Sequence, residues 1–135
     1  MDDLEVAPGI VIPQRELRWR FDTSGGPGGQ HANRSATRVE LSFDLARSDH
    51  VDPDTKARML RRLGRRAADG IVSVSVDSTR SQHRNRQLAR QRLAEVLAEA
   101  SRRPRPRKRT RVPRTAKQRR RKAKQRRAET KRLRR

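Results

Sequence analysis

The positive charge of this chain is concentrated at one end, which limits how much of the chain can fold around a core. Residues 101–135 hold 20 of the 37 lysines and arginines and one of the 15 acidic residues, so they carry +19 of the formal net charge of +22. Their few apolar side chains cannot bury a core. These are Val112, Ala116, Ala123, Ala128 and Leu133. We therefore expect one small folded domain over residues 1–100, whose net charge is only +3.

The charge of the C-terminal segment predicts a polyanionic partner, because such a density of like charges repels itself. Nucleic acid and an anionic membrane surface are the two candidates. No stretch approaches the roughly 18 apolar residues of a membrane span, and the segment has no aromatic residue to anchor it in lipid. We therefore expect nucleic acid and no membrane. The excess of 31 arginines over 6 lysines suits phosphate contacts, although a GC-rich genome would produce the same bias.

Residue types used for metal and redox chemistry are scarce. The chain has no cysteine, which excludes disulfides and thiolate metal sites, and its three histidines are scattered. We expect no metal and no cofactor. Residues 1–5 include three acidic side chains, unlike the basic start of a secretory signal or mitochondrial transit peptide. This start favours a cytoplasmic bacterial protein, which we expect to be a monomer.

Alternating apolar and polar residues predict three strands, over residues 17–22, 38–45 and 71–76. Asp52 and Pro53 predict the start of a helix that ends at Asp69 and Gly70. A second helix is expected over residues 81–100. Its apolar stripe comprises Ala89, Leu93, Val96, Leu97 and Ala100.

The order of these elements predicts a small α+β domain, β-β-α-β-α, with one sheet backed by helices. Its large aromatic residues, Trp19, Phe21 and Phe43, are expected in the core. Prolines at positions 104, 106 and 113 predict an extended linker over residues 101–114. Residues 115–118 fit a capping box, and residues 115–135 are rich in helix formers that repel one another. We expect this basic tail to be disordered alone and partly helical when bound to RNA.

A long glycine-rich segment separates the first two strands. Residues 25–29 contain four glycines, and the run ends in Gly28, Gly29 and Gln30. A Gly-Gly pair permits backbone conformations that present N–H groups outward, as an oxyanion hole requires. Glycine-rich loops are common, however, and by composition alone a flexible turn is the more frequent explanation.

The sequence around these glycines is more specific than the glycines themselves. Residues 24–41 resemble the catalytic loop of class I peptide chain release factors, in which a glycine run ends in Gly-Gly-Gln and a strand follows. Further motifs match along the chain: Ile12-Pro13, Asp69-Gly70-Ile71-Val72, Arg80-Ser81-Gln82, Asn85-Arg86 and the basic tail. Over essentially its full length the chain resembles the alternative ribosome-rescue factor B family of peptidyl-tRNA hydrolases.

This resemblance implies hydrolysis of the ester of P-site peptidyl-tRNA at the peptidyl transferase centre. Gly28, Gly29 and Gln30 would be catalytic, with the Gln30 backbone N–H donating to the oxyanion and its side chain shaping the pocket for water. The tail would enter the small-subunit mRNA entry channel and contact ribosomal RNA (rRNA). The implied tail residues are Arg105, Arg107, Lys108, Arg109, Arg111, Arg114, Lys117, Arg119, Arg120 and Lys124.

Release should be independent of a stop codon, because body and tail leave no room among 135 residues for codon-reading domains. Two alternatives remain open. The protein could be a structural RNA-binding ribosomal or assembly protein, or a release-factor-like protein integrated into the large subunit. His31, beside Gln30, could act as a base, although an exposed or RNA-contacting histidine is the simpler interpretation.

Overall fold

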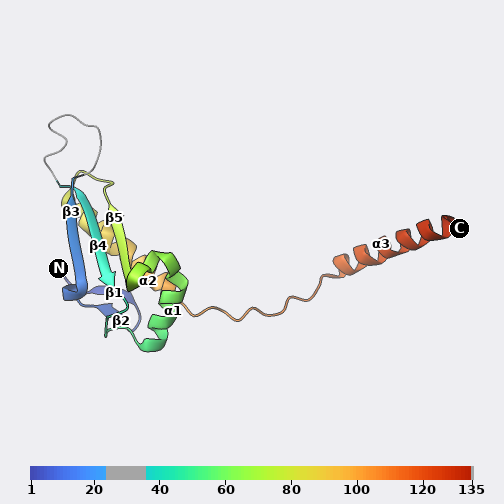
Figure 1. The fold of residues 1–135 in the computed structure, drawn as a ribbon, viewed down its shortest axis with the longest axis horizontal. Coiled ribbons are helices and arrows are strands. Elements are labelled where there is room, and N and C mark those ends of the chain that lie inside the picture. Colours follow the sequence, from blue (N-terminus) through green and yellow to red (C-terminus); the bar gives the residue numbers. More distant parts are fainter. Residues whose placement is uncertain (24–35, 135) are drawn as a thin grey trace. The chain divides into compact units, whose positions relative to one another are not determined.

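The computed structural model describes residues 1–23 and 36–134 (Figure 1). The chain divides into two units, Met1–Arg103 and Pro104–Arg135. The first holds the core, and the second is the basic tail.

The first unit is built on a three-stranded antiparallel sheet in the order β3-β4-β5. Its strands are β3 (Leu17–Asp22), β4 (Arg38–Asp44) and β5 (Ile71–Val76). The central strand β4 alternates strictly between buried residues and partly or fully exposed ones, because one face of the sheet is covered and the other meets solvent. All three predicted strands and the α+β class are confirmed.

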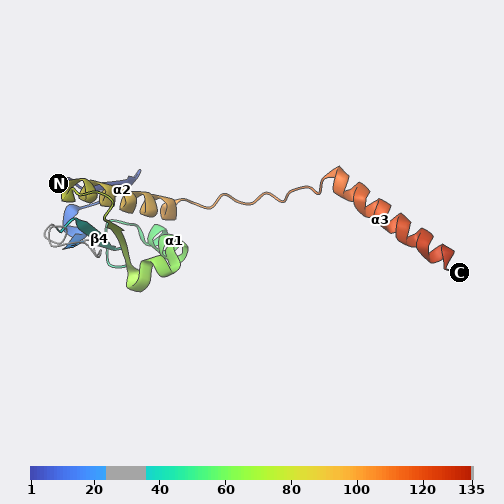
Figure 2. The same cartoon turned by 90° about the horizontal axis from the view of Figure 1, so that it is seen from above.

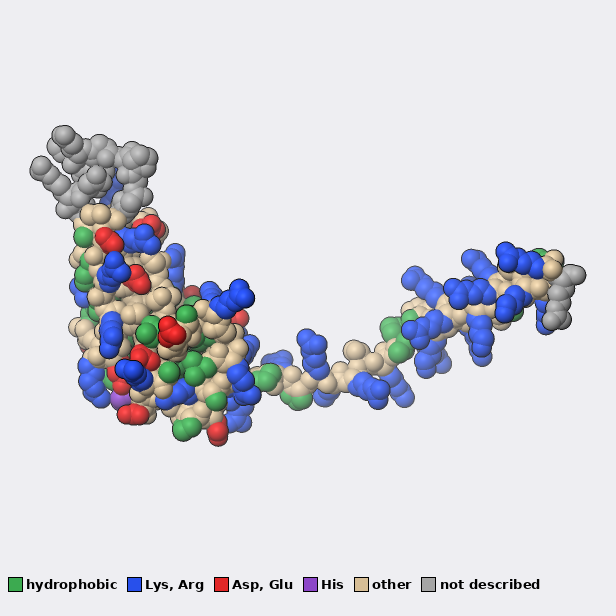
Figure 3. All heavy atoms as spheres, in the orientation of Figure 1, with side chains coloured by type: hydrophobic (Ala, Val, Ile, Leu, Met, Phe, Trp, Pro, Cys, Tyr) green, Lys and Arg blue, Asp and Glu red, His purple; other side chains and the backbone are tan. Residues whose placement is uncertain are grey.

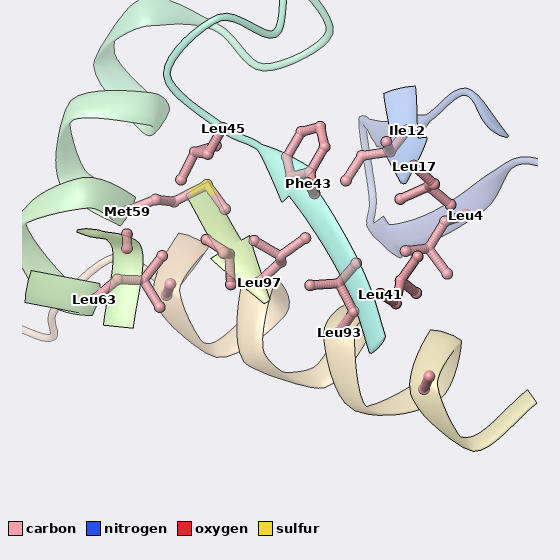
Figure 4. Close-up of a cluster of buried hydrophobic side chains, with 14 of the residues drawn as sticks. Leu4, Ile12, Leu17, Leu41, Phe43, Leu45, Met59, Leu63, Leu93 and Leu97 are labelled. Carbon is pink, nitrogen blue, oxygen red and sulfur yellow. The ribbon is translucent and has the colours of Figure 1, made fainter. Parts of the chain in front are cut away.

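Two helices, α1 (Pro53–Leu63) and α2 (Gln82–Ser101), close the core. Figure 2 shows α2 running along one face of the sheet. The Asp52 side chain caps α1 by accepting from Thr55 N at 2.9 Å, and Ser81 Oγ caps α2 by accepting from Arg84 N at 3.3 Å. Leucine side chains from α2 meet β4 and the residues around it (Figure 4). Among the fully buried side chains are Leu41, Phe43, Met59, Leu93 and Leu97.

An N-terminal hairpin was missing from the sequence prediction. Strands β1 (Leu4–Ala7) and β2 (Ile10–Ile12) pair antiparallel as a separate two-stranded sheet. Pro8 and Gly9 form the turn, and the φ of +83° at Gly9 suits the third position of a type II turn. The hairpin adds the buried side chains of Leu4, Ile10 and Ile12 to the core.

The predicted end of the first helix was wrong. Helix α1 stops at Leu63, and Gly64 follows with a φ of +53°. A kinked 3-10 segment, η2 (Gly64–Gly70), then leads into β5. The glycine at position 64 ends the α-helix six residues before the Asp69-Gly70 signal, because its left-handed backbone cannot continue the helix.

Two of the three predicted core aromatics are not in the core. Phe43 is buried, but Trp19 is half-buried and Phe21 is 40% exposed. Both lie on the covered face of β3 with Leu17, but β3 is an edge strand and the cover does not extend over its end. The alternation therefore gave the correct face but not the extent of its burial.

The second unit consists of an irregular exposed stretch followed by α3 (Arg114–Leu133). The capping box at residues 115–118 is wrong, because the helix begins at Arg114 after Pro113 and has no side-chain cap. The structure has Arg114–Leu133 as a helix, and the expectation that the tail is disordered when alone stays a prediction. Arginine, lysine, glutamine and alanine are strong helix formers, and each like-charge pair costs only about 0.2–0.5 kcal/mol. Within residues 1–23 and 36–134, no helix is long and apolar enough to cross a membrane.

Candidate functional site

The paired ends of β3 and β4 form the base of the glycine-rich segment. Asp22 pairs with Arg38 in the last register position, so the chain leaves β3 and enters β4 at the same end of the sheet (Figure 1). The predicted catalytic residues Gly28, Gly29 and Gln30 lie outside the described residues, as does His31. The structure therefore describes how both ends of the segment are held.

The returning end is held by two side chains at the start of α2. Gln82 Nε2 donates to the carbonyl oxygen of Ala36 at 2.9 Å, and Asn85 Nδ2 donates to that of Thr37 at 2.7 Å. Because α2 is packed along the sheet, these two bonds tie the chain directly after residue 35 to the rigid core.

Asn85 is fully buried, and every hydrogen-bonding position of its amide is used. Besides Thr37, Nδ2 donates to Thr79 O at 2.9 Å. Its Oδ1 accepts from Thr79 N at 3.1 Å and from Thr79 Oγ1 at 2.8 Å. The side chain thus joins the loop base, the turn before α2 and the helix itself. The sequence showed the Arg80–Gln82 and Asn85-Arg86 motifs as part of the resemblance but gave neither Gln82 nor Asn85 a role.

The uncovered face of the sheet beside this base carries mixed charge. A shallow pocket there is lined by Arg20, Asp22, Arg38 and Glu40. Arg20 Nη2 lies 3.8 Å from Asp22 Oδ2, and Arg38 Nε donates to Ser75 Oγ at 3.2 Å. Two cations and two anions balance one another, so this pocket does not select an anion or a cation.

A Ser-Glu-His cluster elsewhere in the first unit does not have the connectivity of a catalytic triad. Ser48 Oγ donates to Glu16 Oε2 at 2.7 Å, and Glu16 Oε1 lies 2.7 Å from His50 Nδ1. The serine therefore hydrogen-bonds to the carboxylate and not to the imidazole that would activate it. The cluster joins η1 (Gln14–Glu16) to the chain after β4. Among the described residues, no three histidine or acidic side chains are grouped as a metal site would require.

The predicted tail residues divide between the two parts of the second unit. Arg105, Arg107, Lys108, Arg109 and Arg111 lie in the irregular stretch before α3 and are exposed. The others lie on α3, where Arg114, Lys117, Arg120 and Lys124 line one groove and Arg119 lies outside it. Figure 3 shows Lys and Arg side chains projecting along the whole tail, whereas on the first unit they alternate with acidic ones.

Cations surround α3 on all sides. Successive residues are turned by about 100° around a helix axis, so the run of basic residues from Arg119 to Lys122 covers a full turn. None of the residues of α3 is buried. Such a helix suits a partner that encloses it more than a flat surface that meets one side.

The family model of the RF-1 domain matches residues 4–134, nearly the entire chain. The chain belongs to the RF-1 domain family. The resemblance to class I release-factor catalytic domains is thereby confirmed.

Two relatives of the chain differ in the kind of protein that their names describe. The chain is 28% identical over 97 residues to the peptidyl-tRNA hydrolase ArfB of Pseudomonas putida, covering 72% of this chain and 71% of the relative. It is 30% identical over 94 residues to the large ribosomal subunit protein mL62 of Mus musculus, covering 69% of this chain and 46% of the relative. The chain is therefore similar both to a hydrolase and to a ribosomal protein.

Proposed function

We propose that this protein is a ribosome-rescue hydrolase, which cleaves the ester of P-site peptidyl-tRNA on stalled ribosomes without a stop codon. The observation that carries the proposal is the anchored base of the Gly28-Gly29-Gln30 segment in a chain of the RF-1 domain family. A catalytic tripeptide in a long loop needs a fixed base if its backbone is to be positioned, and Gln82 and Asn85 supply one.

The proposed reaction is attack of water on the ester carbonyl, which releases the peptide as an acid and leaves the 3′ hydroxyl on the tRNA. The Gln30 N–H donates to the oxyanion that develops in the tetrahedral transition state. One such donor contributes roughly 3–4 kcal/mol. Gly28 and Gly29 permit the backbone conformation that directs this N–H, and the Gln30 side chain admits water in preference to larger nucleophiles. No metal or cofactor takes part.

The tail recognises the vacant mRNA entry channel of the small subunit. Support comes from the distribution of charge, because α3 presents cations on all sides and nucleic-acid backbone presents phosphates. A channel occupied by mRNA would exclude the tail, so the protein selects ribosomes whose mRNA has ended. The proposal places the protein in the cytoplasm, acting as a monomer on ribosomes.

The relative mL62 favours a second candidate, a non-catalytic component of the large ribosomal subunit. Peptide release separates the two functions. Ribosomes carrying labelled peptidyl-tRNA are prepared with mRNA ending at the P site, with a sense codon in the A site or with a stop codon there. We expect release on the truncated mRNA, none with long mRNA downstream and no preference for a stop codon. Binding to the complex with truncated mRNA, with no release from that complex or from the other two, would support the structural role and contradict the hydrolase.

A further inference from the structure

The exposed end of β3 carries two aromatic rings and a guanidinium group in one cluster. Trp19 and Phe21 are parallel within 2°, with ring centroids 6.2 Å apart. The Arg86 guanidinium carbon lies 5.1 Å from the Trp19 centroid and 5.4 Å from the Phe21 centroid. Phe21 is 40% exposed and lies only three residues before position 24, where the glycine-rich segment begins. The exposed part of the Phe21 ring is therefore open to a flat partner.

Unused hydrogen-bond donors lie in the same cluster. Trp19 Nε1, Arg86 Nε and Arg90 Nη1 are buried, and within residues 1–23 and 36–134 none of them has an acceptor. Burying an unpaired donor costs free energy that an incoming acceptor would recover. All three groups are donors, and two belong to cations one helical turn apart on α2. Among the described residues, the cluster therefore has no acceptor for these donors, and an anionic acceptor would suit it best.

From these two observations we propose that Trp19, Phe21, Arg86 and Arg90 form a binding site for one unpaired RNA nucleotide. The base stacks on the exposed Phe21 ring, and the phosphate or a base carbonyl accepts from the Arg86 guanidinium after that side chain turns outward, with the positive charge of Arg90 beside it. Aromatic rings and arginine planes are the groups on which unpaired RNA bases stack.

The surrounding contacts allow this binding. Within the described residues, the Nη2 atom of Arg86 hydrogen-bonds only to Met1 Sδ, at 3.7 Å, so the guanidinium can turn toward a phosphate without breaking a strong hydrogen bond. Arg90 stays in place, because its Nη2 donates to the carbonyl oxygens of Asp2 and Asp3 at 2.7 and 3.1 Å. The nearest acidic side chain along the strand, Asp22, points to the opposite face and is paired with Arg20.

The site extends the proposed function by adding an RNA contact on the folded domain, next to the loop, to those of the tail. It rests on that function only for the presence of RNA there, and its test involves no hydrolysis. Trp19 is the only tryptophan of the chain, so intrinsic fluorescence reports on this cluster directly.

The test titrates the full-length protein with a single-stranded hexaadenylate and with an abasic ribose-phosphate hexamer of equal charge. We expect saturable quenching of Trp19 by the hexaadenylate only, although the tail binds both. Phe21→Leu keeps an apolar side chain without a stacking surface and should lower the affinity for hexaadenylate relative to the abasic hexamer by about 5- to 100-fold. Arg86→Lys keeps the positive charge but loses the planar guanidinium, and it should lower this relative affinity less than Phe21→Leu does. Matched controls are Arg84→Lys on the same helix and Ile71→Ala, which alters an equally exposed apolar residue on β5.

Equal quenching by the two hexamers, or none by either, would overturn the proposal. An unchanged affinity ratio in Phe21→Leu would do the same, provided that its circular dichroism and unfolding midpoint match the parent. If neither hexamer quenches but Phe21→Leu binds ribosomes more weakly, the cluster contacts a ribosomal protein and the nucleotide assignment is wrong.

Discussion

The two units of this chain use arginine in opposite ways. In the first unit, Arg58 donates through Nε and Nη2 to the carbonyl oxygen of Ser101 at 3.2 and 3.0 Å, and Arg62 Nη1 donates to that of Arg102 at 2.7 Å. These bonds tie the end of α2 to α1. From Pro104 to Arg134, in contrast, no lysine or arginine of the described chain has a side-chain hydrogen bond or ion pair within the protein.

This difference separates two kinds of information. In the first unit the identity and geometry of each side chain matter, because a particular carbonyl or ring must be met. In the tail the number and spread of charges matter, because phosphates of a nucleic acid are all alike. Substitutions that preserve charge but change shape should therefore affect the two units differently.

The largest effect is expected at the centre of the glycine-rich segment. Gly29→Ala adds a Cβ where the proposed backbone conformation requires glycine, and release from stalled ribosomes should fall by about 100-fold or more. Ribosome binding should be unchanged, since the tail is intact. Peptide release and pelleting of the same ribosomes measure the two quantities. Gly25→Ala, outside the tripeptide, is the control, and full release by Gly29→Ala would exclude the proposed mechanism.

The tail should show the reverse behaviour. Replacing Lys117, Arg120 and Lys124 with glutamine should weaken ribosome binding about tenfold or more and lower the slope of log affinity against log salt by about 2 to 3. The control keeps the charges and changes the shapes, as Lys117→Arg, Arg120→Lys and Lys124→Arg. If the control loses as much affinity as the glutamine variant, the tail recognises its partner by shape and the comparison fails.

Within the first unit, Asn85 tests the importance of specific contacts. Asn85→Leu fills the same space but leaves Thr37 O and the Thr79 groups without partners, so the free energy of unfolding should fall by about 2–3 kcal/mol. Denaturant unfolding followed by Trp19 fluorescence measures this free energy, with Gln87→Leu, at an exposed position of the same helix, as the control.

The second loop-base contact tests positioning and not stability. Gln82→Ala should lower peptide release while the unfolding midpoint stays within error, because it removes only the exposed hydrogen bond to Ala36 O. Unaltered release would mean that the loop base needs no anchor.

The smallest effect is expected at Asp52. Hydrogen bonds from Thr55, first from its backbone N–H and then from its side chain, hold the pKa of the Asp52 carboxyl below its ordinary value of 3.8. A lowered pKa means that the charged cap stabilises the fold above pH 3.8 and that this contribution disappears as the pH falls through the pKa of the folded state. Thermal midpoints of the parent and Asp52→Ala should therefore differ at pH 7 and converge in acid.

The sequence predicted the elements whose signals are local. Alternation located β3, β4 and β5, and Asp52-Pro53 located the start of α1 correctly. The sequence prediction failed at the end of the first helix, because two glycines could end it: Asp69-Gly70 was the predicted stop, but Gly64 comes first along the chain. The hairpin at Pro8-Gly9 was missed because its strands have only four and three residues. A Pro-Gly pair between two short apolar stretches was nevertheless a usable signal.

The candidate site was predictable as a motif but not as a structure. Gly28, Gly29 and Gln30 stood out by resemblance, whereas the contacts that hold the segment are made across the fold by Gln82 and Asn85, 46 and 48 residues from their acceptors. Such contacts depend on how α2 packs on the sheet. The exposure of Phe21 was equally beyond the sequence, because alternation reports which face a residue occupies and not where a helix stops covering it.

A helix with cations on every side has no preferred rotation about its axis. If α3 turns by one residue and advances by one rise, it presents nearly the same set of charges to its surroundings. A phosphate-lined partner would therefore hold it strongly at many depths with little barrier between them. The tail could slide to a depth fixed elsewhere in the complex, and its sequence could change by exchange of neighbouring residues without loss of affinity.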